Sequence, residues 1–330
     1  MRQARIKVPT DEGPGVYHAM TRTVNGERLF DDVAKEILRK QLRQVADYTG
    51  VEVITYAILT NHFHVLLRVP QQSELIDAEL LRRYQVLYPC PTRYQTQRLE
   101  VIQSQLATNG PEAVAWRKRQ RALMGDLSQF MKLLKQRFSI WFNKSHRRYG
   151  TLWAERFKSI LLEPKDRVVE TVAAYIDLNG VRAGLAADPK DYRFCGYAEA
   201  VAGSEPAQRG IRAISAPANE SWEAAHAGYR QVLFGTGAGA HKHGGNIAAE
   251  DFARVMRAGG RLPLATVLRC RVRYFTDGAV LGGKAFVETQ RSILRRRSGR
   301  GERLASRPLP DLTDWGELTT LRQLRRRAFG

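Results

Sequence analysis

Two apolar runs stand almost back to back near the start of the chain, at 51–59 (VEVITYAIL) and 62–69 (HFHVLLRV). Both are rich in β-branched residues, which favour strands. The Thr60-Asn61 step between them leaves room only for a tight corner, and Pro70 ends the second run. The sequence therefore predicts two consecutive strands held in one sheet, and the rest of the fold must be built around them.

Further elements flank these strands. Alternation at 16–23 (VYHAMTRT) predicts a strand, and apolar spacing over 32–48 predicts a helix that an aspartate caps. An amphipathic helix is expected over 127–146, a strand over 157–163 and a further helix over 166–179. Strand, helix, strand, strand, helix, strand is the split βαβ order. We therefore expect an α+β protein with a ferredoxin-like βαββαβ core and an antiparallel sheet, followed by one more helix.

The chain is long enough for more than this core. Residues 71–125 interrupt the pattern with two or three helical pieces, which predicts a helical insertion within a domain spanning 1–200. The range 201–248 is rich in Gly, Ala, Ser and Pro and is expected to be a linker. Short helical patterns and arginine clusters over 249–330 predict a helical, basic C-terminal region, either helix-turn-helix-like or a small structural appendage.

The charge balance is strongly basic, with 53 Lys and Arg against 33 Asp and Glu, a net charge of +20 and a pI near 10.3. Such a field attracts polyanions, of which nucleic acid is the commonest. No apolar run reaches the length of a membrane span, so no membrane association is expected. Cys90, Cys195 and Cys270 are too few and too scattered for a disulfide framework, which favours a cytoplasmic, nucleoid-associated protein.

Chemistry is suggested by His62-Phe63-His64. Residues two apart in a strand point to the same face, so the two imidazoles would project side by side and suit two ligands of one divalent cation. A third ligand would have to come from another element. The alternative is that both rings simply serve nearby polar groups. A second pair, His241 and His243, lies in a Gly-rich stretch without a strand pattern and is interpreted as loop.

Tyr175 lies on the helix predicted before Gly180, with Asn179 four residues further on. Residues four apart share a helix face, so both side chains can turn towards the histidines. Asn179 offers a carbonyl oxygen that can serve as a third ligand, and Tyr175 offers a phenol. The alternative is a core tyrosine with its hydroxyl at the rim.

Three segments together carry a family resemblance: NHFHVLL at 61–67, LSQFMKLLKQRFSIWFNKSHRRYGTLWAERFKS at 127–159 and AAYIDLNGVRAGL at 173–185. In this order they resemble the IS200-like single-tyrosine (HUH) transposases, and within these the REP-associated tyrosine transposases. The similarity covers roughly 15–70 and 126–200.

The resemblance implies a ferredoxin-like fold, with Tyr175 as the nucleophile and His62, His64 and Asn179 holding Mg²⁺ or Mn²⁺. It implies a transposase that cleaves and transfers single-stranded or hairpin DNA through a 5′-phosphotyrosine. The family usually has Asn-Pro where this chain has Asn179-Gly180, and we expect the glycine to end the helix instead.

DNA is the expected partner, bound by a monomer or a homodimer. Trp141, Trp153 and Phe157 can stack bases, although core packing is the alternative for each and the more probable role for Phe157. The side chains expected to grip the DNA backbone are Lys135, Arg137, Arg147, Arg148, Arg156 and Lys158.

Two other functions remain open on the sequence: a tyrosine nickase of the relaxase or replication-initiator type, and a catalytically silent nucleic-acid-binding protein. Tyr149 and Tyr192 are the alternative nucleophiles. Because metal-binding histidines must be neutral, an ordinary imidazole pKa predicts that activity falls below about pH 6.

Overall fold

A computed structural model describes residues 6–8, 13–71, 74–215, 221–235, 279–298, 306–308 and 318–321. Within these ranges the strands form one seven-stranded sheet in the order β2-β3-β1-β4-β5-β7-β6. The strands are β1 (Gly15–Arg22), β2 (Glu52–Ile58), β3 (His62–Val69), β4 (Lys158–Leu162), β5 (Val280–Gly283), β6 (Ser306–Pro308) and β7 (Leu318–Leu321).

Four of these strands form the centre of the molecule. β3 pairs antiparallel with both β1 and β2, and β4 pairs antiparallel with β1. β1 and β2 therefore run parallel with β3 between them, which is the split βαβ arrangement. The four strands expected from the sequence are found within one or two residues of their predicted ends, and the α+β class is confirmed.

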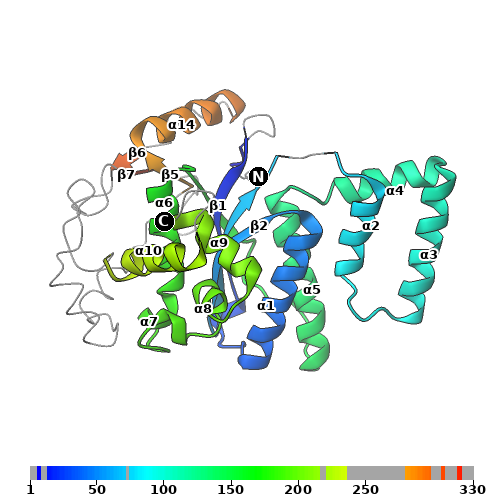
Figure 1. Ribbon diagram of the computed structural model, residues 1–330, viewed down its shortest axis with the longest axis horizontal. Coiled ribbons are helices and arrows are strands. Elements are labelled where there is room, and N and C mark those ends of the chain that lie inside the picture. The colour runs from blue at the N-terminus through cyan, green and yellow to red at the C-terminus, as the bar shows by residue number, and fades with distance from the viewer. Residues whose placement is uncertain are drawn as a thin grey trace.

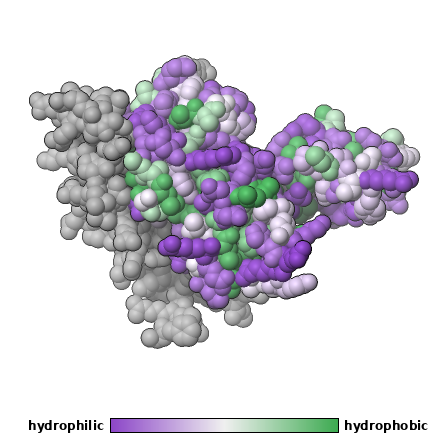
Figure 2. All heavy atoms as spheres, turned by 90° about the horizontal axis from the view of Figure 1, so that it is seen from below, coloured by the Kyte–Doolittle hydropathy of each residue, from purple (hydrophilic) through white to green (hydrophobic). Residues whose placement is uncertain are grey.

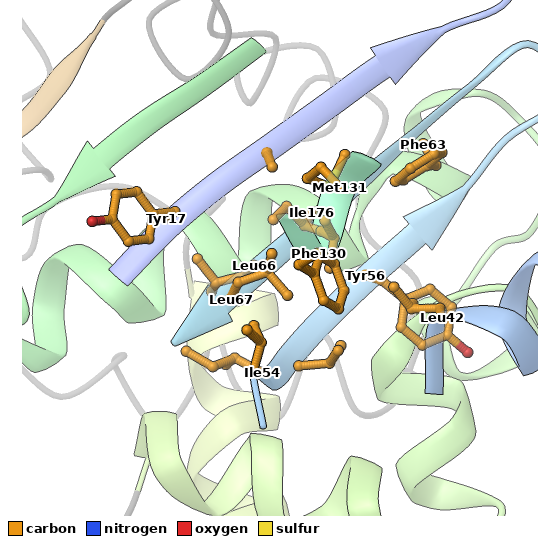
Figure 3. Packing of buried hydrophobic residues seen from close by; sticks show 14 of the residues in the cluster. Tyr17, Leu42, Ile54, Tyr56, Phe63, Leu66, Leu67, Phe130, Met131 and Ile176 are labelled. Atoms are coloured by element: carbon orange, nitrogen blue, oxygen red, sulfur yellow. The ribbon is translucent and has the colours of Figure 1, made fainter. Parts of the chain in front are cut away.

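Two long helices cover one face of the sheet, as Figure 1 shows: α1 (Asp32–Thr49) and α5 (Leu127–Ser145). The Asp31 carboxylate caps α1 by accepting from the Ala34 N–H at 2.7 Å, and Gly50 ends it with a φ of 69°. Figure 3 shows side chains of α5 meeting those of the strands. The apolar stripe of α5 is buried as predicted: Leu127, Phe130, Met131, Leu134, Phe138 and Phe142.

The opposite face is covered by helices that follow β4 in the chain. They are α6 (Asp166–Asp177), α7 (Asn179–Arg182), α8 (Gly196–Val201), α9 (Glu205–Ser215) and α10 (Trp222–Gly235). The prediction of a linker over 201–248 is therefore wrong for the stretches that form α9 and α10. Both helices are rich in alanine and bury an apolar stripe, which small residues made inconspicuous in the sequence.

The insertion is helical, as predicted, and consists of α2 (Asp77–Val86), α3 (Arg93–Thr108) and α4 (Pro111–Arg121). It extends away from the sheet beyond α1 and α5 (Figure 1). The Tyr48 hydroxyl on α1 donates to Gln120 at 2.8 Å and ties the insertion to the core. On the face that Figure 2 shows, the described residues are mostly hydrophilic on both the main body and the insertion, with several hydrophobic areas between them.

The C-terminal part belongs to the same sheet, because β5 pairs in parallel with β4. The expectation of a separate helical region over 249–330 is wrong for 280–283, 306–308 and 318–321, which are strands, while α14 (Lys284–Ser298) is helical as expected. The strand VLGG carries no alternation that a sequence pattern would reveal. The helices predicted between 249 and 271, the second histidine pair and Cys270 lie outside the described residues.

Cys195 is buried and Cys90 is exposed. Across the helices that the structure places, none combines the length and apolar character that a bilayer crossing would require.

Candidate functional site: a histidine cluster facing Tyr175

Three histidines gather on one face of the central sheet. In the pairing of β1 with β3, Arg22 lies opposite His62 and Met20 lies opposite His64. His18 is two residues before Met20 and therefore shares this face. The ring centroids of His62 and His64 are 5.2 Å apart. The two imidazoles thus project side by side.

Phe63 points to the other face, where its ring centroid is 5.9 Å from that of Trp153. This alternation keeps an apolar contact below the strand and a polar cluster above it.

Hydrogen bonds orient both rings of the motif. His64 Nδ1 lies 2.9 Å from His18 Nε2, and His62 Nδ1 lies 2.6 Å from the side-chain oxygen of Asn61. The Asn61 oxygen can only accept, so His62 carries its proton on Nδ1. With the same tautomer, His64 would donate from Nδ1 to His18 Nε2. In both rings the lone pair of Nε2 then faces away from these bonds, which is the arrangement of a metal-binding histidine held by a second partner.

Both imidazoles are kept neutral. Burial, together with the charges of Arg22 and Arg182, lowers the pKa of His62 to about 4. Burial also holds the pKa of His64 well below its ordinary value, with the neighbouring His18 and His62 as the next causes. The prediction that activity falls below about pH 6 used the pKa of a solvated imidazole. Because burial lowers the pKa of both rings, we now expect the fall at a lower pH.

Tyr175 approaches this cluster from α6. Its ring centroid lies 5.9 Å from that of His64, with the planes perpendicular, and 6.0 Å from that of His18. The side chain is 9% exposed. The helix after the last core strand thus covers the histidine face, and its tyrosine contacts two of the three rings.

Asn179 lies just beyond α6, at the first residue of α7. Its amide nitrogen donates to the backbone oxygens of Tyr175 at 3.0 Å and of Ile176 at 3.1 Å. The amide oxygen takes no part in these two bonds. The helix expected over 166–179 is found as α6, which ends at Asp177, within two residues of the predicted end.

Gly180 does not end a helix as predicted, since it sits inside α7. A Cβ there would meet the Tyr192 ring at 2.5 Å. The glycine is therefore needed for the close approach of Tyr192, which backbone patterns in the sequence do not show.

Arg182 is a site residue that the sequence reasoning missed. Its guanidinium carbon lies 4.0 Å from the centroid of the Tyr175 ring, and its Nη2 donates to the Tyr175 carbonyl oxygen at 2.6 Å. It was missed because the short helix α7 turns it back onto α6, which linear spacing does not reveal. His18 was also missed, although the alternation of its strand and the expected pairing of β1 with β3 could have found it.

A buried carboxylate anchors the end of α6 that carries Tyr175. Asp177 accepts from the Thr55 hydroxyl at 2.7 Å, the Tyr197 N–H at 3.1 Å and the Tyr229 hydroxyl at 2.6 Å. Burial raises the pKa of Asp177 to about 6, while these donors lower it. One carboxylate therefore joins α6 to β2, α8 and α10.

We expect Tyr229→Phe to destabilise the protein by about 1.5–3 kcal/mol, the usual contribution of a hydrogen bond to a charged group. The ring still fills its buried position, so only the bond to Asp177 is lost. Urea unfolding at pH 7.5 measures the change, with Tyr94→Phe on the exposed surface of α3 as the control. Equal stability of both variants and the wild type would contradict the anchoring role.

The predicted DNA-gripping residues separate into two groups. Arg137 is half-buried and donates to the Leu87 backbone oxygen at 2.7 Å, and burial lowers its pKa. It therefore joins α5 to the insertion, and its predicted DNA contact is not supported by this placement. Lys135 donates to the Glu155 backbone oxygen at 2.8 Å, and Lys158 pairs with the Glu155 carboxylate at 3.5 Å.

Three arginines remain at or near the surface. Arg148 pairs loosely with Glu27 at 3.7 Å, whereas Arg147 and Arg156 are exposed. Of the six predicted residues, only Arg147 and Arg156 can meet a phosphate without first breaking a contact within the protein.

The aromatic residues also separate by burial. Trp153 and Phe157 belong to the core, and the Trp153 N–H donates to the Ser139 hydroxyl at 2.8 Å, so neither can stack a base. Tyr192 is buried with its hydroxyl on the Ile58 carbonyl oxygen at 2.6 Å. Tyr149, by contrast, is 96% exposed.

The described residues offer a divalent cation only some of the ligands that it needs. Among the described residues, no group of three or more His, Cys, Asp or Glu side chains is arranged to hold a metal ion. His62 and His64 supply two neutral imidazoles, so a third protein ligand would have to be an amide oxygen such as that of Asn179. The residues fit a cation with open positions, and they do not form a closed structural site.

The fold and site together define an α+β protein with a histidine cluster and a tyrosine facing each other across a sheet and a helix. No protein-family model matches the chain, and no curated protein does. Among solved structures, one similar chain is a REP-associated tyrosine transposase bound to a REP hairpin. It is 14% identical, with a TM-score of 0.35, and the match covers 62% of this chain and 87% of that one. The relationship is a distant structural one.

Proposed function

We propose that the protein is a single-tyrosine (HUH) DNA strand transferase with a ferredoxin-like core, acting on single-stranded or hairpin DNA as a transposase. The observation that carries the proposal is the contact of the Tyr175 ring with His64 and His18. The phenol of α6 thus meets the imidazoles of β1 and β3, and one of these, His64, is oriented, neutral and beside His62.

In the proposed reaction the Tyr175 hydroxyl oxygen attacks the phosphorus of a DNA phosphodiester. The new O–P bond forms as the bond from phosphorus to the 3′ oxygen breaks. The phenol gives up its proton and the 3′ oxygen takes one up, so the products are a 5′-phosphotyrosine and a free 3′-OH. The ester is exchanged and not hydrolysed, so the strand can be rejoined without an energy source.

His62, His64 and the amide oxygen of Asn179 would hold Mg²⁺ or Mn²⁺. When bound, the cation supplies positive charge for the phosphate oxygens. Asn61 and His18 fix the orientation of the two imidazoles, and burial keeps them unprotonated. Arg182 holds Tyr175 in place through its stack on the ring and its bond to the backbone.

The proposed DNA partner fits the net charge of +20. An unpaired strand can bend its phosphate into a site on a sheet face, whereas a duplex holds each phosphate in a fixed register. Arg147 and Arg156 are the exposed arginines best placed to hold the backbone. The protein would act as a monomer or homodimer.

Incubation with a 3′-labelled hairpin DNA and Mn²⁺, followed by denaturing electrophoresis, tests the proposal, because the 3′ fragment is the one that stays joined to the tyrosine. We expect a denaturant-stable adduct with the hairpin, little with the matching perfect duplex, and none after chelation. Binding without any adduct would leave a nucleic-acid-binding protein. An adduct formed equally on a duplex nick site would favour a nickase of the relaxase type.

We also expect the pKa of His62 to appear in the pH dependence of stability. Its folded value of about 4 lies below the unfolded value of 6.5, so its contribution is present above pH 6.5 and is lost as pH falls towards 4. The loss would be about 2–3 kcal/mol.

Urea unfolding of the metal-free wild type and His62→Asn at pH 7.5 and pH 4.5 measures this contribution. The wild type should lose more stability on acidification than the variant does. Asp177 contributes equally to both proteins, so the difference isolates His62. Parallel losses would show that His62 has an ordinary pKa.

A further inference from the structure

We propose that the loop after α5, residues 146–151, is a binding site for single-stranded nucleic acid, in which Tyr149 stacks on an unpaired base. Any role of the loop in DNA strand transfer rests on the proposed function. Its binding of a single strand does not.

Tyr149 is the most exposed large hydrophobic side chain in the described part of the chain, at 96%. Within that part it takes part in no hydrogen bond and no ring contact. It therefore contributes nothing to the core, and both faces of its ring are open to a flat partner.

The loop that carries Tyr149 has a defined shape. The Asn143 amide donates to the Gly150 carbonyl oxygen at 3.0 Å, and the Arg148 N–H donates to the Asn143 carbonyl oxygen at 2.8 Å. Arg147 has a φ of 49° and Gly150 a φ of 89°, so two left-handed residues set the turn on either side of Tyr149. The ring is therefore presented from a fixed backbone, which reduces the entropy lost on binding.

Positive charge surrounds the exposed ring. Lys144 and Arg147 are exposed, and neither pairs with a carboxylate among the described residues. Arg148 makes only the 3.7 Å contact with Glu27. An open aromatic ring among unpaired cations is the combination that binds a strand through base stacking and phosphate attraction.

Backbone bonds place this loop near His62. The Thr23 N–H donates to the Asn61 carbonyl oxygen at 2.9 Å, and the Val24 N–H donates to the Leu152 carbonyl oxygen at 2.9 Å. The Ala154 N–H donates to the Arg22 carbonyl oxygen at 3.0 Å, and Arg22 is the partner of His62 in the sheet. The residues that follow the loop, 152–154, thus join the same end of the sheet as His62, about two strand spacings (~10 Å) across, and Trp153 among them contacts Phe63 on the face away from the histidines.

The chemistry favours an unpaired strand over a duplex. In a duplex both faces of each internal base are already stacked on neighbours, so Tyr149 would find no free face. In a single strand, stacking tolerates any base, because each offers an aromatic face. The site would therefore select strand state without selecting sequence.

The test is the binding of a fluorescently labelled oligothymidylate to the full chain in the presence of a chelator, followed by anisotropy. We expect Tyr149→Ala to weaken binding about 5- to 100-fold and Tyr149→Phe to bind like the wild type, because stacking needs the ring and not the hydroxyl. Tyr94→Ala is the matched control, since Tyr94 is 69% exposed on the insertion. Arg147→Ala should reduce the slope of log affinity against log salt by about 0.7.

Unchanged binding by Tyr149→Ala, an equal loss in Tyr149→Phe, or an equal loss in Tyr94→Ala would each overturn the proposal. So would the same fractional loss for a duplex of matched length. The binding test contains no metal and does not score cleavage. Absence of the covalent adduct in the separate test with Mn²⁺ would therefore reject the proposed function and leave the binding result unchanged.

Discussion

Tyr175→Phe is expected to lower the formation of the covalent DNA adduct by about 10⁴-fold or more, because no other group can replace a covalent nucleophile. The phenyl ring retains its contacts with His64 and Arg182, so the fold and the binding of hairpin DNA should be unchanged. Quantifying the adduct on denaturing gels with labelled hairpin and Mn²⁺ provides the measurement.

Tyr192→Phe and Tyr149→Phe are the matched controls for this change. Tyr192→Phe loses the hydroxyl bond to Ile58 and should cost stability but leave the adduct. Tyr149→Phe should affect neither. Persistence of the adduct in Tyr175→Phe, with its loss in one of these controls, would move the nucleophile to that residue.

His64→Ala is expected to reduce adduct formation about 10²- to 10³-fold, the typical effect of removing one group that stabilises transition-state charge. The ring is nearly buried between His18 and Tyr175, so its removal takes away a metal ligand and a contact of the nucleophile together. Single-turnover cleavage over a range of Mn²⁺ concentrations provides the measurement, and excess Mn²⁺ should not restore the rate.

Because a buried alanine leaves a cavity, His64→Gln serves as a second variant and urea unfolding as a check on the fold. His226→Gln, on α10 and outside both the histidine cluster and the 146–151 loop, is the control and should cleave like the wild type. Full activity of both His64 variants while they remain folded would exclude the imidazole from the reaction.

The central fold could be predicted because its elements carry strong local patterns. The β-branched runs of β2 and β3 and the apolar stripe of α5 each identify their element without tertiary information. The helices α9 and α10 and the strands β5 to β7 were missed, because their stability comes from burial against elements that are distant in sequence. VLGG becomes a strand only beside β4, where Glu163 accepts from the Gly283 N–H at 2.6 Å.

The candidate site was predictable to the extent that strand and helix periodicity governs it. The two-residue spacing of His62 and His64 places both rings on one face, and the helix after β4 brings Tyr175 to that face. Arg182 depends on how α7 folds back, and the Arg137 contact with Leu87 depends on where the insertion docks. Local sequence determines neither of these placements. Arg182 was therefore missed as a site residue, and Arg137 was predicted to bind DNA.

We propose that Tyr175 is the residue that becomes joined to DNA at the histidine cluster. Trapping the adduct on hairpin DNA, digesting both polymers and sequencing the modified peptide by mass spectrometry tests it directly. We expect a nucleotide attached to the peptide that contains Tyr175. When His62 and His64 are both replaced, we expect this peptide to carry no nucleotide. A nucleotide on Tyr149, or on Tyr175 regardless of the histidines, would contradict it.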